Sequence, residues 1–323
     1  MARAIRFYQT GGPEVLKMES VEVGAPGPGE ARVRHTFVAV NFIDIYYRTG
    51  QYPQALPSGL GSDAVGVVEA VGEGVTDIKA GDRVGYLSGP LGAYADVRLV
   101  PANMLIPLPP GVSDSVASTL MMKGMTAQYL FRQVYPLHGG ETILYHAAAG
   151  GVGLIACQWA RALGVTMIGV VSTDEKAELA KAHGCAHTIV GPRENIAARV
   201  RELTGGKGVQ VVFDSVGKDT LEASLDSLQE RGTLVSNGTS SGPVVIDTHK
   251  LATKGSLWLT RPAMAHYFKP RSHMLAMAKE VFDLVISGEI KSEPSQTYAL
   301  DDAVEAHRAL EARKTVGATV LVP

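Results

Sequence analysis

The chain has 323 residues, enough for two domains, and 46% of them are apolar, so it has material for a sizeable core. The formal charge of −2 gives no general attraction to nucleic acid or membrane surfaces, and no apolar run reaches the roughly 18–20 residues of a membrane span. The two cysteines exclude a disulfide framework, and without a secretory signal pattern at the N-terminus a cytoplasmic setting is expected.

The first 120 residues are punctuated by glycine and proline and contain short β-like runs. Runs 31–40, 65–71 and 82–87 have strand character, and the turn signals at 59–61 and 79–82 separate them. This pattern predicts a mostly β, barrel-like domain.

From about residue 125 to 262 strand-length apolar runs alternate with helical patterns, which predicts a parallel sheet covered by helices. Gly184 and Gly232 are expected at helix C-termini. The expected strands are 142–147, 165–171, 188–190, 209–213 and 233–236, and the expected helices include 193–203 and 218–230.

The last 60 residues predict an amphipathic helix over 272–287 and a second helix over 302–313 with Asp301 as its N-cap. A final strand at 318–322 could complete either domain.

A glycine-rich turn, Ala147-Ala-Ala-Gly-Gly-Val-Gly, joins the strand 142–147 to a helical pattern. Gly150 and Gly151 are expected to adopt backbone conformations closed to other residues. With Val152 they bring bare N–H groups toward a pyrophosphate at a helix N-terminus, and Gly153 lets the helix pack closely on the sheet. A turn built for packing alone does not explain three small residues and three glycines in seven positions.

The tip of the next strand is where a dinucleotide-binding domain reads the adenine ribose. Here the tip carries Ser172 and Thr173 and no carboxylate, and Lys176 follows one helical turn later. Two hydroxyls and a cation suit a 2′-phosphate, so NADPH is the expected cofactor. The alternative is that Lys176 is an ordinary solvated helix residue. Asp174 is expected to cap that helix.

Several motifs together resemble the zinc-free quinone oxidoreductases, the NADPH:quinone reductase or zeta-crystallin-like group of the medium-chain dehydrogenase/reductase superfamily. The resemblance extends over essentially the whole chain and rests on these segments: Gly11-Gly-Pro-Glu-Val-Leu, Asn41-Phe-Ile-Asp, Gly59-Leu-Gly-Ser-Asp-Ala-Val-Gly, Lys79-Ala-Gly-Asp-Arg-Val, the glycine turn, Phe213-Asp-Ser-Val-Gly, Thr260-Arg-Pro and Leu310-Glu-Ala-Arg.

The resemblance implies an α/β fold with two domains. A GroES-like, β-rich catalytic domain would comprise 1–124 and 263–323, and a Rossmann domain with a doubly wound parallel sheet would comprise 125–262 and bind NADPH. It also implies a homodimer, for which the segment with Leu257 and Leu259 is a candidate edge strand.

The positions that correspond to zinc ligands in related alcohol dehydrogenases hold Asn41 and Ser62-Asp63, and the segment matching the structural zinc loop has no cysteine. Zinc prefers thiolate and imidazole ligands, so no metal is expected. Without a Lewis acid, a substrate that accepts hydride readily is expected, such as a quinone or an electron-poor enone.

On the substrate side, the resemblance implies that Asn41 hydrogen-bonds the nicotinamide ribose or the substrate. Tyr46 and Tyr52 would line the acceptor pocket or donate a proton, and the alternative is that they pack in the barrel. Thr126 would contact the nicotinamide side. Lys123 belongs to the same segment as Thr126. Its alternative to a contact with the cofactor is an interdomain salt bridge.

The remaining candidate residues lie at predicted strand ends or match family positions. Arg261 would lie near the nicotinamide end and Arg313 near the 2′-phosphate. One departure is Gly191, where close relatives carry a tyrosine, and Arg193 is a possible substitute cation. The strand-end candidates for cofactor binding are Ser215, Asn237, Gly238, Ser240 and Ser241, and the alternative is that 237–241 is only a polar turn.

The sequence therefore predicts an NADPH-dependent, metal-free quinone reductase. Reduction of activated C=C bonds, as in enones and 2-alkenals, stays open as an alternative reaction. A role in RNA binding or as a structural, crystallin-like protein is the alternative from another class, although the charge and the lack of a basic, aromatic stripe disfavour nucleic acid as main partner.

Overall fold

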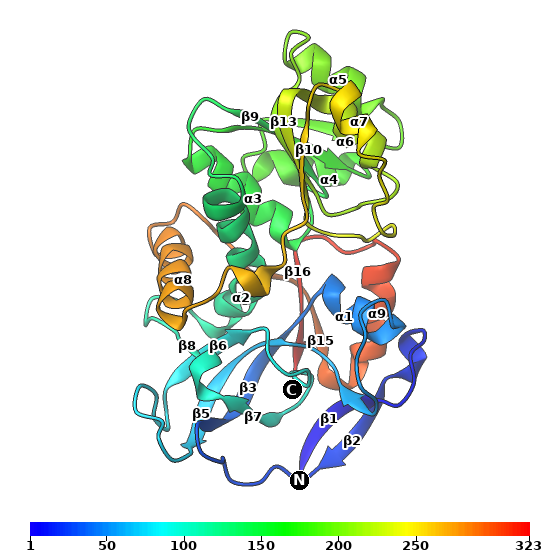
Figure 1. Cartoon of the computed structure of the whole chain (residues 1–323). Helices are drawn as coiled ribbons and strands as arrows, with labels where there is room; N and C mark the ends of the chain where they lie inside the picture. The colour runs from blue at the N-terminus through cyan, green and yellow to red at the C-terminus, as the bar shows by residue number, and fades with distance from the viewer. The chain divides into compact units, whose positions relative to one another are not determined.

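Residues from both ends of the chain build the first of two units. A computed structural model describes residues 1–323 and divides them into Met1–Met125 with Lys269–Pro323, and Thr126–Phe268 (Figure 1). Both termini therefore belong to the first unit. No helix of either unit has the length and apolar character required to cross a membrane.

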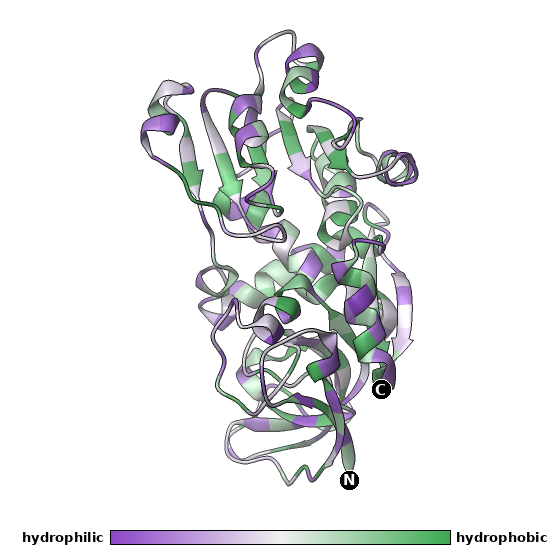
Figure 2. Cartoon of the chain, turned by 90° about the vertical axis from the view of Figure 1, so that its right-hand side faces the viewer, coloured by the Kyte–Doolittle hydropathy of each residue, from purple (hydrophilic) through white to green (hydrophobic).

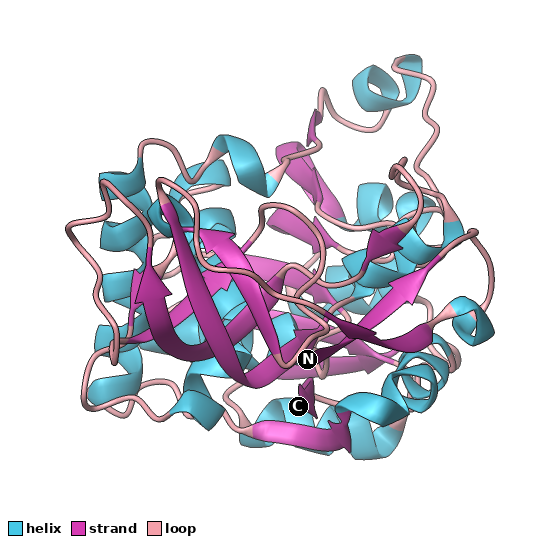
Figure 3. Cartoon of the chain, turned by 90° about the horizontal axis from the view of Figure 1, so that it is seen from below, coloured by secondary structure: helices cyan, strands magenta, loops and turns pink.

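The first unit contains two sheets, whose strands appear as magenta arrows in Figure 3. The larger sheet is antiparallel except where its last two strands, β15 and β16, pair in parallel. The smaller sheet has the order β2-β1-β4: β2 Lys17–Val21, β1 Ala2–Phe7 and β4 Ser58–Gly59. The larger has the order β15-β16-β3-β5-β6-β8, with β7 also paired to β3: β15 Pro294–Ala299, β16 Ala318–Val322, β3 Glu30–Val40, β5 Asp63–Val71, β6 Arg83–Leu87, β8 Ile106–Pro107 and β7 Val97–Pro101.

Helices α1 (Phe42–Thr49), α2 (Asp114–Tyr129), α8 (Arg271–Ile286) and α9 (Ala303–Glu311) accompany these sheets. The sequence did not predict α1 or α2. Most of α2 from Ala117 onward is buried, so its sequence lacks the one-sided apolar stripe that marks a surface helix. Asp301 is not the N-cap of α9. Asp302 takes that place, and the Asp301 carboxylate instead accepts a hydrogen bond from Arg3.

The second unit is a parallel sheet with helices on its connections, as predicted, and the predicted α/β fold class is confirmed. Its strand order is β11-β10-β9-β12-β13-β14. Figure 2 shows hydrophobic residues concentrated along these strands. The strands are β9 Thr142–His146, β10 Thr166–Val171, β11 His187–Val190, β12 Val209–Asp214, β13 Leu228–Ser236 and β14 Trp258–Thr260, and the helices are α3 Gly151–Ala162, α4 Asp174–Ala182, α5 Ile196–Leu203, α6 Leu221–Ser227 and α7 His249–Thr253.

The strand order fixes where a ligand binds in this unit. The chain builds outward from β9 in one direction through β10 and β11, then returns to β12 on the other side of β9. The carboxyl ends of β9 and β12 are thus the topological switch point, where open α/β sheets bind their ligands.

One of the two predicted helix-end glycines is placed differently by the structure. Gly184 follows α4 with φ 98° and ends that helix as predicted. Gly232 lies inside β13, which begins five residues before the predicted strand. A Cβ on Gly232 would lie 2.9 Å from Leu228 and 3.0 Å from the Gln229 carbonyl oxygen, so close packing within the strand explains this glycine.

Gly66 provides a test of the first unit's packing. In β5 it lies opposite His35 of β3, and a Cβ there would lie 2.1 Å from the Arg34 carbonyl oxygen. We expect Gly66→Ala to force these strands apart and lower the free energy of unfolding by about 1–3 kcal/mol or more. Urea unfolding measures this. The control Gly24→Ala, where a Cβ meets nothing within 4 Å, should change stability by no more than about 0.5 kcal/mol. Equal stability of both variants would contradict the close approach.

Candidate active site

The glycine-rich turn lies between β9 and α3, at the switch point. The special conformation predicted for Gly150 and Gly151 is wrong, because neither has a positive φ and it is Ala147 that is left-handed, with φ 56°. The reason given for Gly153 is confirmed: a Cβ there would lie 2.5 Å from the carbonyl oxygens of Ala147 and Ala148. The turn is bare because the helix approaches the strand end closely.

The N-terminus of α3 has no side chain that satisfies its first N–H groups. Gly150 is the N-cap, in extended conformation, and it offers no capping oxygen. The first turn contains no acidic residue. Free N–H donors and the positive end of a 12-residue helix therefore face the switch point, which suits a phosphate group.

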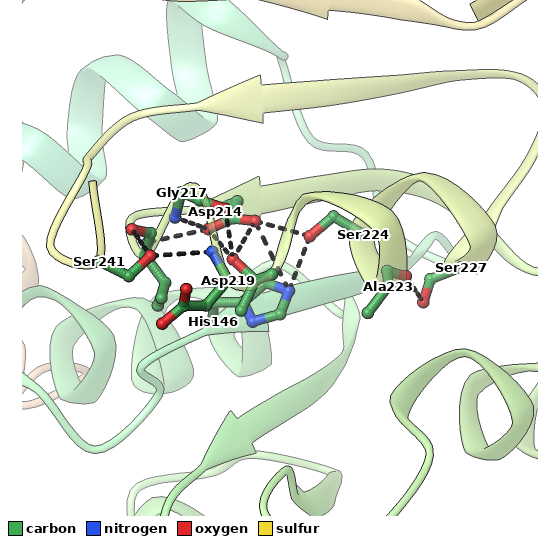
Figure 4. A network of polar contacts seen from close by, with 10 residues as sticks. His146, Asp214, Gly217, Asp219, Ala223, Ser224, Ser227 and Ser241 are labelled. Carbon is green, nitrogen blue, oxygen red and sulfur yellow. Dashed lines mark hydrogen bonds and ion pairs between the residues drawn. The ribbon is translucent and has the colours of Figure 1, made fainter. Parts of the chain in front are cut away.

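A buried polar network joins the carboxyl ends of β9 and β12 (Figure 4). Asp214, the last residue of β12, accepts hydrogen bonds at one carboxylate oxygen from the N–H groups of Val216 (2.8 Å) and Gly217 (3.0 Å). Its other oxygen accepts from the hydroxyls of Thr220 and Ser224, both at 2.7 Å. These bonds fold the loop after β12 back on itself, and so set the shape of the switch-point edge.

His146, the last residue of β9, completes this network as a neutral group. Burial lowers its pKa, and its Nε2 lies 2.9 Å from the Ser224 hydroxyl. Since that hydroxyl donates to Asp214, Nε2–H must donate to Ser224. Burial alone would raise the pKa of Asp214, but the pKa is lowered. With a neutral imidazole 4.0 Å away, we attribute the lowering to the hydrogen bonds rather than to an ion pair.

The strand-end candidates Ser215, Asn237, Gly238, Ser240 and Ser241 lie on the adjoining loops after β12 and β13. Gly238 is required by packing, because a Cβ would lie 2.4 Å from the Ser215 carbonyl oxygen. The Ser241 hydroxyl holds the two loops together: it accepts from Asp219 N–H (3.0 Å) and donates to the Val216 carbonyl (2.8 Å). Asn237 Oδ1 and Ser236 Oγ are buried without hydrogen-bond partners, so this edge has polar atoms available to a ligand.

The tip of β10 carries the residues predicted to read a 2′-phosphate. Thr173 is the N-cap of α4, and its hydroxyl accepts from Lys176 N–H at 3.3 Å. The prediction that Asp174 caps this helix is therefore wrong. Asp174 instead forms an ion pair with Arg193, so the proposed substitute cation already has a carboxylate partner. Ser172 is exposed and Lys176 half-buried.

Two further predicted residues lie in the second unit. Arg261 follows β14 and donates to the Ser236 carbonyl at 2.7 Å, so it belongs to the same carboxyl edge. Thr126, in α2, has its hydroxyl 3.7 Å from the Met264 sulfur. The second unit thus gathers at one edge the glycine turn, the β10 tip, the loops after β12 and β13, and Arg261.

In the first unit, Asn41 lies directly before α1 and is buried. Its side-chain Nδ2 donates to Asp63 Oδ2 (3.1 Å), and its Oδ1 accepts from the Lys123 ammonium (2.9 Å). Asp63 Oδ2 also accepts from Met122 N–H at 3.2 Å. The amide is therefore held between a carboxylate and an ammonium, both of them buried.

A second carboxylate lies behind this amide. Asp44 accepts at Oδ2 from Asn41 N–H (2.8 Å) and from the Tyr94 hydroxyl (3.0 Å), and Tyr94 also hydrogen-bonds His307 at 3.0 Å. Burial raises the pKa of Asp44 to about 7. Burial also raises the pKa of Asp63 to about 6, although the nearby Lys123 charge and the Asn41 hydrogen bond act against it.

The predicted aromatic pair lies beside Asn41. Tyr46 is buried in α1, and Tyr52 follows the helix, with the two ring centroids 5.2 Å apart and Tyr52 N–H donating to the Tyr46 carbonyl at 3.0 Å. Asn41, Tyr46 and Tyr52 thus come from one continuous segment. Arg313 follows α9 of the same unit, where it is exposed and has φ 56°.

Sequence reasoning did not assign a role to Asp44, Asp63, His146 or Asp214. Asp44 carries a local signal, since it stands three residues after the N-cap Asn41 in a capping arrangement. His146 lies one residue before the end of a predicted strand and Asp214 directly follows another, so both could have been suspected for that reason. No local pattern reveals the contact of Lys123 with Asn41, because 82 positions separate them.

Comparison with known proteins matches both parts of the chain to family models. Residues 27–110 match the "Alcohol dehydrogenase GroES-like domain" and residues 151–280 match "Zinc-binding dehydrogenase". The chain is 53% identical over 325 residues to a "Quinone oxidoreductase" of Pseudomonas aeruginosa, with all of both chains covered. It is 46% identical to a "2-haloacrylate reductase" of a Burkholderia species, covering all of this chain and 99% of the relative. A crystal structure of Escherichia coli quinone oxidoreductase complexed with NADPH superimposes with a TM-score of 0.98 at 46% identity over the whole of both chains.

The zinc-binding name does not agree with the side chains found here. An ammonium and an amide lie beside Asp63, and an ammonium only donates hydrogen bonds and cannot ligate a cation. No group of three or more His, Cys, Asp or Glu in residues 1–323 is placed to hold a metal ion. The donor set around Asn41 thus does not fit zinc.

Asp44 predicts a pH dependence of stability. With a pKa of about 7 instead of the usual 3.8, it keeps a proton in the native state between about pH 4 and 7 that the unfolded chain has lost. The native state therefore binds more protons, and the free energy of unfolding falls as pH rises through this range. Each unit of pKa difference corresponds to about 1.4 kcal/mol.

Asp44→Asn cannot lose that proton, so we expect its stability to fall less between pH 4.5 and 8 than that of the unsubstituted chain. Urea unfolding at fixed protein concentration measures both curves. Parallel curves would show that Asp44 is ionised in the native state throughout.

Proposed function

Since the chain belongs to the quinone oxidoreductase family of the medium-chain dehydrogenase/reductase superfamily, we propose that it reduces quinones with NADPH and without a metal ion. The observation that carries the proposal is the bare, uncapped N-terminus of α3 at the switch point of the second unit's sheet. The choice of quinone rests on the names of full-length relatives, and the choice of NADPH on the β10 tip and on the E. coli relative described as complexed with it.

The residues present fit a dinucleotide. Gly153 leaves room that a Cβ would fill, and the unpartnered Asn237 Oδ1 and Ser236 Oγ offer polar contacts at the same edge. In the proposed complex the N–H groups of the first turn of α3, including Gly151 and Val152, bind the pyrophosphate. Ser215, Gly238 and Ser240 line the adjoining edge, and Ser241 shapes it through its bonds to Asp219 and Val216.

Ser172, Thr173 and Lys176 are proposed to bind the 2′-phosphate. The Thr173 hydroxyl oxygen caps α4, and its O–H is the proposed donor to the phosphate. Lys176 is the proposed principal cation at this tip, and Arg193 forms an ion pair with Asp174. Arg313 is proposed as a second cation for the same phosphate.

NADPH, when bound, supplies a hydride, and the quinone takes up that hydride and one further proton to become a hydroquinone. Asn41 offers an amide N–H to an acceptor oxygen, and Thr126 and Arg261 contact the nicotinamide side. Tyr46 and Tyr52, whose rings are tilted by 57° to each other, are proposed to orient a planar acceptor, and a tyrosine hydroxyl is the proposed proton donor.

A second candidate reaction is reduction of an activated C=C bond, because a 2-haloacrylate reductase is 46% identical over the full length. Loss of NADPH absorbance with naphthoquinone, phenanthrenequinone, an enone and 2-chloroacrylate separates the two. We expect the highest kcat/KM with a quinone. Turnover confined to the enone or the haloacrylate would replace quinone reduction by the alternative, and no turnover of any of them would reject both.

Lys176→Ala tests the cofactor assignment. Loss of a charged hydrogen bond costs about 1.5–3 kcal/mol, so we expect the Kd for NADPH to rise roughly 10- to 100-fold while that for NADH stays within about twofold. Fluorescence titration measures both. Lys181→Ala is the matched control, since Lys181 lies in the last turn of the same helix, away from the β10 tip, and pairs with Glu178. Equal loss for both cofactors would remove Lys176 as the phosphate-reading residue.

We also propose a cytoplasmic homodimer, with no nucleic acid as main partner. The two cysteines are unpaired and the formal charge is −2, which supports these assignments. β14 is an edge strand, so its outer N–H and C=O groups lack a neighbouring strand, and Trp258 on it is 68% exposed. Pairing of two β14 strands would join the two parallel sheets.

Trp258→Glu places a charge on that edge, and we expect it to convert the dimer to a monomer in sedimentation velocity. Ile286 is also an exposed apolar side chain, but it belongs to the first unit, so Ile286→Glu should leave the dimer intact. A monomeric unsubstituted chain, or a Trp258→Glu dimer of undiminished strength, would contradict this interface.

A further inference from the structure

The proposed function assigns no role to a buried cation in the first unit. Lys123, on α2, is 6% exposed. Its ammonium donates to Asn41 Oδ1 at 2.9 Å and to the Val40 carbonyl at 3.4 Å, so its hydrogen bonds go to the residues at the end of β3 and the start of α1. A lysine this deeply buried costs free energy unless its charge is compensated.

Asp63 compensates that charge without a direct contact. Both groups bond to the same amide, the ammonium at its oxygen and the carboxylate at its nitrogen. Each stabilises the charged form of the other: Asp63 acts against the lowering of the Lys123 pKa by burial, and Lys123 acts against the raising of the Asp63 pKa. Removing either charge would leave the other buried and unpaired.

This arrangement permits only one orientation of the Asn41 amide. An ammonium can only donate, so it must meet Oδ1, and an ionised carboxylate can only accept, so it must meet Nδ2. A flipped amide would place donor against donor and acceptor against acceptor. The helix cap adds a further restraint, since the Asn41 main-chain N–H is bound by Asp44.

The fixed orientation leaves one polar group of the side chain for a ligand. Nδ2 carries two hydrogens, and Asp63 takes one of them. Asp63 is the acceptor that the Asn41 Nδ2 group contacts, and Oδ1 accepts from Lys123. Since Asn41 is 8% exposed, its second N–H is a nearly buried donor that requires an acceptor oxygen.

We propose that Lys123 and Asp63 lock the Asn41 amide so that the chain presents a single, fixed N–H donor to an acceptor oxygen of the bound ligand. Lys123 is thus a positioning residue that acts through Asn41. The lock selects ligands with a carbonyl or hydroxyl oxygen at this point and disfavours those that present only a donor. This inference rests on the proposed function for its activity readouts, but the lock itself is a property of the chain.

Lys123→Met removes the charge and keeps most of the side-chain volume. We expect kcat/KM for the quinone to fall about 100-fold, the scale of a misplaced reacting group, while the Kd for NADPH measured by fluorescence stays within about threefold. Lys279→Met, at a 75% exposed lysine of α8, is the control. Since Lys123→Met leaves Asp63 unpaired, the variant Lys123→Met/Asp63→Asn removes both charges. It should recover thermal stability but not kcat/KM. Recovery of both would mean that Lys123 only balances Asp63, and would overturn the proposal.

A double-mutant cycle tests whether Lys123 acts through Asn41. If it does, Lys123→Met should cost less than about twofold in kcat/KM in an Asn41→Ala background, against about 100-fold in the unsubstituted chain. Equal losses in the two backgrounds would show an independent role and reject the positioning assignment.

A readout without turnover separates this proposal from the proposed function. In ¹⁵N–¹H spectra, the side-chain amide of Asn41, assigned by its loss in Asn41→Asp, should show slow hydrogen exchange that is lost in Lys123→Met. Exchange that is fast in both would overturn the lock whatever the enzyme reduces. A protected amide in a chain that turns over no quinone would keep the lock and reject the proposed function instead.

Discussion

The close approach of α3 to the end of β9 is the constraint on which the cofactor edge depends. Gly153 has room for no side chain, because two main-chain carbonyl oxygens would lie 2.5 Å from a Cβ. That contact seats the helix directly on the switch point, with its uncapped N–H groups outward. The phosphate-binding character of the turn is therefore a consequence of packing. Gly153 allows the helix to approach and needs no contact with the ligand. The residues proposed to bind the phosphate do so through main-chain N–H groups and need no side chains.

The two buried polar clusters serve different purposes although both are built around an aspartate. Asp214 is fully engaged by main-chain and hydroxyl donors and keeps its pKa below the usual value, so it behaves as a fixed anion that shapes a loop. Asp63 has one bare oxygen and a raised pKa, and depends on Lys123 at a distance. A carboxylate with all its hydrogen bonds made, such as Asp214, only makes the loop rigid. Asp63 depends on the charge of Lys123, and so links helix α2 to Asn41 at the end of β3.

The sequence predicted what is periodic or local. The alternation of strands and helices from β9 to β13 followed from apolar runs, and the packing role of Gly153 followed from its place in the turn. α2 was missed because it is buried on nearly all sides and its apolar residues are not gathered on one face, so its sequence has no period to detect. Lys123 was weighed only as a salt-bridge partner, since the amide it holds is 82 positions away and only the fold brings the two together. The conformation expected of Gly150 was wrong because Ala147 takes the left-handed turn.

The buried ammonium also limits which reaction the first unit can assist. A Lewis acid at this place would present an uncompensated positive charge to the substrate. The Lys123 ammonium instead donates to Asn41 Oδ1, and its charge is balanced by Asp63. In the proposed complex the ligand meets a neutral amide N–H, polarised by its two charged neighbours but carrying no charge itself. Such a donor stabilises a developing oxyanion much less than a metal ion does. The acceptor must then disperse its new charge internally, which a quinone does through its conjugated ring and an ordinary ketone does not. The preference that we expect for an easily reduced acceptor thus follows from how one lysine is buried.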